Sequence, residues 1–213
     1  VGGDMDGLPD VHAKTIRESC ARHHALIVNR YFLEALRLAE KLSQSERRTP
    51  NIPQPLRDRI EHYKSVVPAA RASAPSGHDE MPYRVLLGQI AERLRATYDH
   101  RSGQYERVEQ LTDDLQIIVN SLEANRGRYA GLFLIRRFLR RVRTFGLHLA
   151  TLDVRQNAEV HRQIVGRALA EPGWETRTAA ERVARLRDAL ARDESPPEVL
   201  EAAGKRALWV FEA

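Results

Sequence analysis

The sequence predicts a mainly α-helical protein that carries at most one or two short strands. Apolar residues recur at helical spacings along most of the 213 residues, and proline-rich stretches separate these periodic segments. A single apolar run departs from the helical period. Charged residues make up 30% of the chain and hydrophobic residues 42%, as in an average soluble protein. This composition excludes a disordered chain and a membrane-spanning protein.

The periodic segments predict helices that are bounded by proline, glycine and capping residues. Pro82, for example, suits a first helical turn, and the residues after it keep one apolar face as far as Tyr98. Two loops, at about residues 43–55 and 66–80, are expected to be flexible because of their proline and glycine content. The expected helices are Ala13–Leu42, Gln54–Ser65, Pro82–Tyr98, Val108–Asn125, Leu132–Val142, Ala158–Leu169, Thr178–Arg192 and Pro197–Ala213.

The segment from Phe145 to Gln156 has a different pattern, because it is a mostly apolar run that ends in polar residues. Such a run is typical of a strand that is buried on both faces in a parallel sheet. Barrel enzymes place their reacting groups where parallel strands end, so a strand ending at Arg155 indicates a helical fragment of a β/α-barrel-type (TIM-barrel-like) enzyme. The alternative is a surface arginine that caps or pairs after the strand.

The opening loop is a second candidate for chemistry. Gly2 and Gly3 allow the backbone to approach a ligand closely, and Asp4 and Asp6 have the oxygen atoms that hold a cation or an arginine. The same pattern also describes an ordinary turn, and it lacks the further ligands of a helical calcium-binding loop. Both interpretations stay open on spacing alone.

Other chemical motifs are weak or missing. The single Cys20 excludes a disulfide framework and a cysteine zinc site and indicates a reducing compartment. The histidines lack the i, i+4 spacing of a zinc pair, so no metal site is predicted from them. The arginines between Arg136 and Arg143 form the strongest basic cluster, but on a helix they wrap around it. A solvated or partner-facing helix is therefore favoured over a nucleic-acid surface.

The ends of the chain and its hydropathy suggest where it belongs. The sequence opens on Val1 without an initiator methionine and stops in mid-pattern, which predicts that residues 1–213 are a single internal fragment of a longer chain. No window reaches the roughly 18 apolar residues of a spanning helix, and the first residues lack the features of an export signal. We therefore expect a cytoplasmic location, with no membrane partner and no nucleic-acid partner.

Three segments resemble a known family in both residues and order. Residues 1–9, Val-Gly-Gly-Asp-Met-Asp-Gly-Leu-Pro, resemble the Gly-Gly-Asp-Arg-Asp-Gly-Asn-Pro loop of phosphoenolpyruvate carboxylases. Residues 82–88, Pro-Tyr-Arg-Val-Leu-Leu-Gly, are similar to that family's Pro-Tyr-Arg helix start. Residues 145–156, followed by His161, resemble its Phe-Gly-Leu … Leu-Asp-Ile-Arg-Gln … His segment. The resemblance is to the bacterial type and covers the chain from Val1 to about Phe211.

The resemblance implies a lyase that joins phosphoenolpyruvate to bicarbonate, giving oxaloacetate and phosphate, in anaplerotic carbon fixation that supplies the tricarboxylic acid cycle. It implies Mg²⁺ or Mn²⁺ with ligands outside this fragment, allosteric control and a homotetrameric parent protein whose partners include the rest of its own chain. Arg155 matches the family arginine that contacts the substrate phosphate, with Gln156 beside it. Gly2, Gly3, Asp4 and Asp6 match the active-site loop.

The sequence also departs from the family pattern. Met5 stands where the family usually has arginine, and Leu8 where it usually has asparagine. The Thr-Ala-His-Pro segment, the acidic metal ligands and the Gly-Arg-Gly-Gly loop do not occur, and Glu212 is not expected to replace a ligand. We therefore expect the fragment alone to be inactive. The alternative function is a non-enzymatic helical interaction module that binds an acidic partner through the residues from Arg136 to Arg143.

Overall fold

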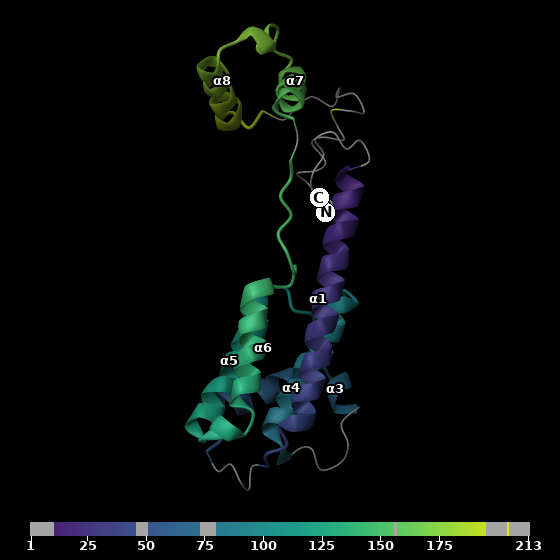
Figure 1. Cartoon of the computed structure of the whole chain (residues 1–213), viewed down its shortest axis with the longest axis vertical. Coiled ribbons are helices and arrows are strands. Elements are labelled where there is room, and N and C mark those ends of the chain that lie inside the picture. Colours follow the sequence, from purple (N-terminus) through teal and green to yellow (C-terminus); the bar gives the residue numbers. More distant parts are fainter. Residues whose placement is uncertain (1–10, 46–50, 73–79, 156, 195–203, 205–213) are drawn as a thin grey trace. The chain divides into compact units, whose positions relative to one another are not determined.

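A computed structural model describes residues 11–45, 51–72, 80–155, 157–194 and 204, and these residues are mainly helical (Figure 1). None of the described helices is long and apolar enough to cross a membrane. The helices, including two short 3₁₀ turns, are α1 (Ala13–Lys41), α2 (Gln54–Val66), α3 (Ala69–Ala72), α4 (Pro82–Tyr98), α5 (Val108–Ala124), η3 (Gly127–Tyr129), α6 (Leu132–Phe145), α7 (Ala158–Ala168), η4 (Trp174–Thr176) and α8 (Ala179–Ala191).

The helices predicted between residues 13 and 192 are confirmed. The α4 helix has the predicted bounds, with Pro82 in its first turn. The short α3 helix lies within the loop expected at about residues 66–80. The flexibility of both loops stays a prediction, because residues 46–50 and 73–79 lie outside the described residues. The helix expected from Pro197 to Ala213 also lies outside them, except for residue 204.

The strand predicted over Phe145–Gln156 is wrong for the described residues, and no barrel strand is present among them. Gly146, with φ of 53°, ends α6, and the Leu149 amide then donates to the Phe145 carbonyl at 2.9 Å in a turn. The chain continues without regular structure to an isolated bridge at Arg155. A strand is stable only beside another strand that accepts its backbone hydrogen bonds, and the described residues supply no such neighbour.

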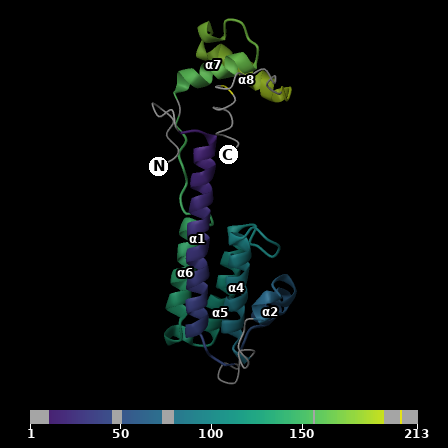
Figure 2. The same ribbon diagram turned by 90° about the vertical axis from the view of Figure 1, so that its right-hand side faces the viewer.

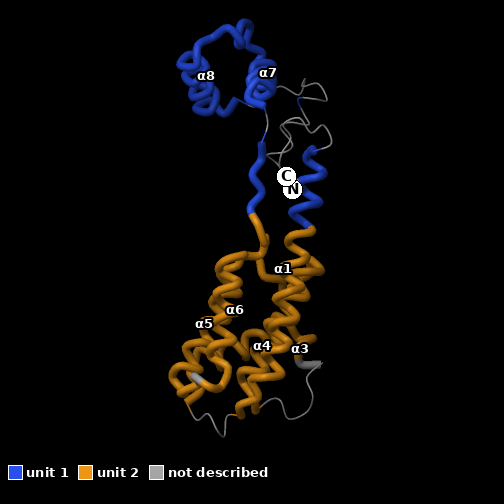
Figure 3. The backbone as a smooth tube through the Cα atoms, in the orientation of Figure 1, with its two compact units in different colours: residues 1–21, 151–213 blue, residues 22–150 orange. Residues whose placement is uncertain are grey.

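The chain divides into two compact units, each of which is described by itself (Figure 3). Unit 1 consists of residues 1–21 and 151–213, and unit 2 consists of residues 22–150. Unit 2 contains all of the large hydrophobic core. The side chains of this core come mainly from α1, α2, α4, α5 and α6, whose arrangement is seen in Figure 2. Tyr31, Leu87, Leu115 and Phe138 are among its fully buried members. The apolar stripes of these helices all face this core, as their periodicity predicts.

A charged network lies inside the helices of unit 2. Asp114 on α5 is fully buried and accepts hydrogen bonds from the hydroxyls of Tyr63, at 2.8 and 2.9 Å, and Tyr105, at 2.6 Å. Arg59 forms an ion pair with the same carboxylate, and Arg93 Nη1 lies 4.0 Å from it. Burial raises the pKa of Asp114, while the Tyr105 hydrogen bond and the Arg59 charge oppose that shift.

Arg93 ties this network to the loop after α4. Its guanidinium donates to the carbonyls of Gly103, at 3.0 Å, and Gln104, at 2.9 Å, and lies over the Tyr105 ring at 3.9 Å. It also donates to the Tyr63 hydroxyl at 2.6 Å. A cation that is buried in this way is stable only when its donors are satisfied. The network therefore joins α2, α4 and α5 through one shared set of charges.

Two side chains of α1 hold the end of α6. The Tyr31 hydroxyl donates to the Gly146 carbonyl at 2.9 Å, and His24 Nδ1 lies 2.8 Å from the Leu147 carbonyl. The two residues are seven apart and so share one face of α1. Burial raises the pKa of Tyr31, which keeps its hydroxyl protonated as a donor. The exit of the chain from α6 is thus fixed to α1 within unit 2.

Unit 1 has a smaller core among its described residues. Its buried apolar side chains there are Ala13, Ile16, Ile164, Ala168, Trp174 and Ala189. Thr178 begins α8 with a capping box, in which it and Glu181 exchange hydrogen bonds with each other's backbone. The sequence at the start of α8 therefore favours a helix strongly, although the helix buries few of its side chains.

Candidate functional site

Arg155 belongs to unit 1, and along the sequence it follows α6 and precedes α7. Its side chain is exposed. It has no hydrogen-bond or ion-pair partner among the described residues. Asn157 follows two positions later and begins α7, because its Oδ1 accepts the Glu159 amide at 2.8 Å. The arginine therefore stands just before a helix N-terminus, which carries a partial positive charge.

The other predicted site residues cannot be placed beside Arg155. Gln156 and the active-site loop residues Gly2, Gly3, Asp4 and Asp6 lie outside the described residues. Met5, Leu8 and Glu212 also lie outside them. Their roles stay predictions.

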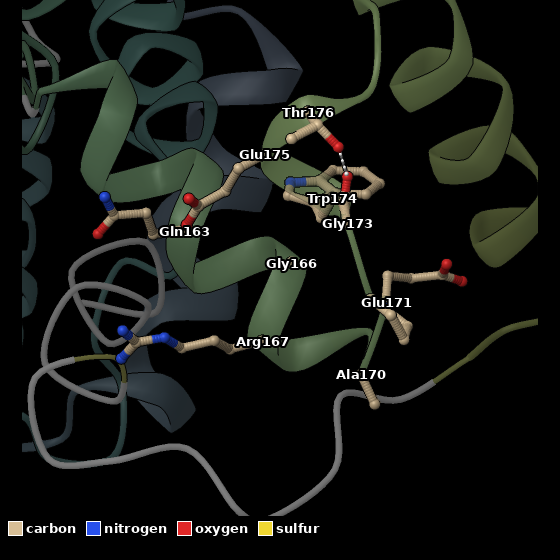
Figure 4. A pocket seen from close by; sticks show the side chains of 10 residues that line it. Gln163, Gly166, Arg167, Ala170, Glu171, Gly173, Trp174, Glu175 and Thr176 are labelled. Atoms are coloured by element: carbon tan, nitrogen blue, oxygen red, sulfur yellow. Dashed lines mark hydrogen bonds between the residues drawn. The ribbon is translucent and has the colours of Figure 1, made fainter.

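A surface depression of about 440 Å³ lies between α7 and η4 (Figure 4). Its lining includes Gln163, Arg167, Glu171, Trp174 and Glu175. Sequence reasoning missed this feature, although the Pro172 and Gly173 pair that turns the chain there is visible in the sequence. Among its lining residues there is no nucleophile beside a base, so the depression is not a catalytic site in itself.

Trp174, one of the lining residues, packs directly on α7. Trp174 is 4% exposed, and a Cβ added to Gly166 would lie 2.4 Å from its Cδ1 atom. Glu171 accepts hydrogen bonds from Arg177, at 2.6 Å, and from Arg185 of α8. The Arg185 hydrogen bond is the largest cause that lowers the pKa of Glu171. These contacts make a structural turn that connects α7 to α8.

Metal ligands do not gather within the described residues. No group of three or more histidine, cysteine, aspartate or glutamate side chains that could hold an ion is found there. His24 stacks on His100 with ring centroids 5.6 Å apart, and Cys20 is exposed and free. The described residues therefore do not fit the divalent cation that the family resemblance implies.

The basic cluster on α6 is largely satisfied by its own unit. Arg136 pairs with Glu123 at 2.5 Å, Arg141 pairs with Glu34, and Arg143 donates to Gln116 at 3.0 Å. The arginines of the cluster that have no partner among the described residues are Arg137 and Arg140. The cluster therefore helps to hold α6 against α1 and α5, and the binding of an acidic partner through it stays a prediction.

Comparison with known proteins identifies close relatives. The family model described as phosphoenolpyruvate carboxylase matches residues 1–200. A protein named phosphoenolpyruvate carboxylase from Xanthomonas oryzae pv. oryzae is 41% identical over the whole chain, which covers 24% of that relative. Proteins of the same name from Nocardia farcinica and Ralstonia nicotianae are each 33% identical, over 81% and 94% of the chain and over 19% and 21% of their own lengths. The chain spans about a quarter or less of the length of these curated relatives.

Proposed function

The chain belongs to the phosphoenolpyruvate carboxylase family, and we propose that it forms one part of a longer cytoplasmic enzyme, its parent, which joins phosphoenolpyruvate to bicarbonate. The products are oxaloacetate and phosphate. The observation that carries this proposal is the 41% identity along all 213 residues. The parent is a homotetramer under allosteric control, and Mg²⁺ or Mn²⁺ is held by residues elsewhere in its chain. These further features rest on the family resemblance alone.

Arg155 binds the substrate phosphate in this proposal. A guanidinium presents two parallel N–H donors that match a phosphate or a carboxylate, and it stays charged at any physiological pH. Arg155 is exposed, has no partner among the described residues and precedes the start of α7. Each of these features favours an anion at this position.

The segment that leads to Arg155 becomes a barrel strand in the parent. Thr151 to Val154 lack regular structure, and an isolated bridge follows at Arg155. Neighbouring strands from the rest of the parent would accept the backbone hydrogen bonds of this segment and bury Leu152. Arg155 would then stand at the carboxyl end of its strand, where barrel enzymes bind their substrates.

The opening loop and Gln156 complete the part of the active site that this chain provides. Gly2, Gly3, Asp4 and Asp6 approach the substrate, while Met5 and Leu8 remove a guanidinium and an amide that the family usually has there. The 213-residue chain alone is inactive, because groups that act as a unit give little rate when most are removed. Oxaloacetate formation that clearly exceeds a no-protein control would overturn this statement.

The test of the proposed function is Arg155→Lys in the parent enzyme. Lysine keeps the charge but loses the planar fork. The value of kcat/KM for phosphoenolpyruvate should therefore fall, by a factor that corresponds to a loss of about 1.5–3 kcal/mol of binding or transition-state stabilisation. Thermal unfolding of the same variant should change little.

The matched control is Arg137→Lys on α6, an exposed arginine that also has no partner among the described residues. It should leave kcat/KM unchanged. Equal kinetics for both variants in well-folded protein would remove Arg155 from the substrate site. A parent with no carboxylase activity at all would overturn the proposed function itself.

A further inference from the structure

Three leucines form an exposed stripe on α1. Leu26, Leu33 and Leu36 are 54%, 40% and 40% exposed, and all three lie in unit 2. Their spacings of seven and three place them on one side of the helix, as in the apolar seam of a coiled coil. We call these residues the leucine seam. Single exposed leucines need no explanation, but three on one seam mark an interaction surface.

The fold of unit 2 cannot hide the leucine seam. The other side of α1 is already buried in the core through Ile27, Val28, Tyr31, Ala35 and Leu38. Rotating α1 to cover the seam would expose that larger apolar face and would break the Tyr31 hydrogen bond to Gly146. The seam therefore remains uncovered once the helices of unit 2 have packed.

Two arginines give the surface a charge. Arg30 and Arg37 each follow a seam leucine by four positions, so they lie beside the seam, and both are exposed. Neither has an ion-pair partner among the described residues. A helix that docks here would gain by placing carboxylates opposite them, as the flanking positions of a coiled coil do.

The small size of the leucine seam indicates that its partner belongs to the same chain and is not a separate protein. A stable complex between separate chains buries about 800 Å² on each partner, and three partly exposed leucines are a small part of that area. A segment tethered to the same chain needs far less contact, because its effective concentration is high. The relatives are about four times as long as this chain, which covers 24% of the first of them. The proposed parent would therefore supply a tethered partner from the chain outside these residues.

We infer that the leucine seam docks an amphipathic helix from the part of the parent chain outside these 213 residues, with acidic side chains facing Arg30 and Arg37. The inference rests on the proposed function only in requiring that longer chain. It does not depend on the carboxylation reaction. The seam is then a structural interface that joins this helical unit to the remainder of the enzyme.

The experiment is site-specific photocrosslinking in the parent protein, with benzoylphenylalanine in place of Leu33. The crosslinked peptides are identified by mass spectrometry, and the matched control carries the same group in place of the exposed Asp58 on α2. The Leu33 probe should label one main peptide of the same chain, outside residues 1–213 and containing Asp or Glu. The Asp58 probe should not label that peptide.

Several outcomes would overturn the inference. Crosslinks from Leu33 to residues within 1–213 would place the partner inside this chain, and crosslinks between two subunits would make a second copy the partner. The absence of any Leu33 crosslink above the Asp58 control would leave the seam exposed to solvent. The crosslink is detected without an activity assay. A parent protein that is inactive but gives the expected crosslinked peptide would therefore contradict the proposed function and support this inference.

A second measurement uses Leu26→Gln, Leu33→Gln and Leu36→Gln together. The melting temperature of the parent should fall, because glutamine cannot pack in an apolar interface. The 213-residue chain should keep its melting temperature, since the seam is exposed there. An equal fall in both proteins would show that the leucines act within unit 2, and no fall in either would exclude a buried seam.

Discussion

Unit 2 encloses a buried charged network, whereas the ion pairs in the described part of unit 1 lie near its surface. Unit 2 buries Asp114 completely and surrounds it with two arginines and two tyrosines. Unit 1 keeps its main ion pairs near the surface, where Glu171 meets Arg177 and Arg185 with each side chain partly exposed. A buried charge is costly unless every partner is present, whereas a surface pair adds little. The buried network of unit 2 should therefore tolerate the loss of a charged partner far less than the surface pairs of unit 1.

The strongest test of this comparison is Asp114→Asn. The change keeps the volume of the side chain but removes the negative charge that Arg59 and Arg93 face. Loss of one partner from a buried ionic group should lower the free energy of unfolding by about 3–5 kcal/mol. Urea unfolding followed by far-ultraviolet circular dichroism measures it.

The control for Asp114 is Glu123→Gln on the same helix. Glu123 pairs with Arg136, but their side chains are 43% and 54% exposed. The expected loss is below about 1 kcal/mol. If both variants lose the same small amount, the buried network of unit 2 is no more important than a surface pair, and the contrast between the units disappears.

Local sequence signals were sufficient to predict the described helices of both units. Pro82 marks the start of α4, and Gly146 follows the last residue of α6. These signals work because a helix closes its hydrogen bonds within a few residues of itself. Asp114 could also have been found in this way, since it stands among Leu111, Leu115 and Ile118 on an otherwise apolar face. An acid in that position predicts a buried cationic partner.

Contacts between distant segments could not be predicted in the same way. The run from Leu147 to Val154 has the composition of a strand, but its state depends on whether a neighbouring strand is present. The Arg59 and Tyr105 partners of Asp114 come from two other segments, which the helical pattern does not specify. For the candidate site, the resemblance to the family motif predicts a role for Arg155, whereas the spacing of residues alone favoured a surface arginine.

The packing of Trp174 against Gly166 offers a second test, with an intermediate expected effect on the free energy of unfolding. Gly166→Ala should destabilise unit 1, because the new Cβ would lie 2.4 Å from Cδ1 and 2.6 Å from Cγ of Trp174. Overpacking of this kind costs about 1–3 kcal/mol. The emission of Trp174 should shift to longer wavelength as its ring is displaced, and Trp209→Phe in the background makes that signal specific.

The matched variant in unit 2 is Gly88→Ala, which should have the opposite sign. Gly88 lies within α4, and no atom lies within 4 Å of the Cβ that alanine would add. Alanine in a helix interior is favoured over glycine by about 0.5–1 kcal/mol. Stabilisation by both alanines in urea unfolding would mean that Trp174 does not lock α7 as the structure has it.

The smallest effect should come from the acid titration of Glu171. Hydrogen bonds from Arg185 and Arg177 lower the pKa of this carboxyl below its ordinary value of 4.5. The folded state therefore holds the proton more weakly than the unfolded state. The resulting stabilisation is complete above the ordinary value and is lost as the pH falls through the lowered pKa of the folded state. Glu171→Gln removes this titration.

The measurement compares wild type and Glu171→Gln by Trp174 fluorescence, in the Trp209→Phe background, from pH 7 downward. Wild type should be the more stable of the two at neutral pH, and the difference should shrink below about pH 4.5, the ordinary value of the carboxyl. Glu181, whose pKa is also lowered, titrates in both proteins and cancels in the comparison. A difference that stays constant down to the lowest pH would show that Glu171 contributes packing and not charge, and unit 1 would then lose the surface pairing that separates it from unit 2.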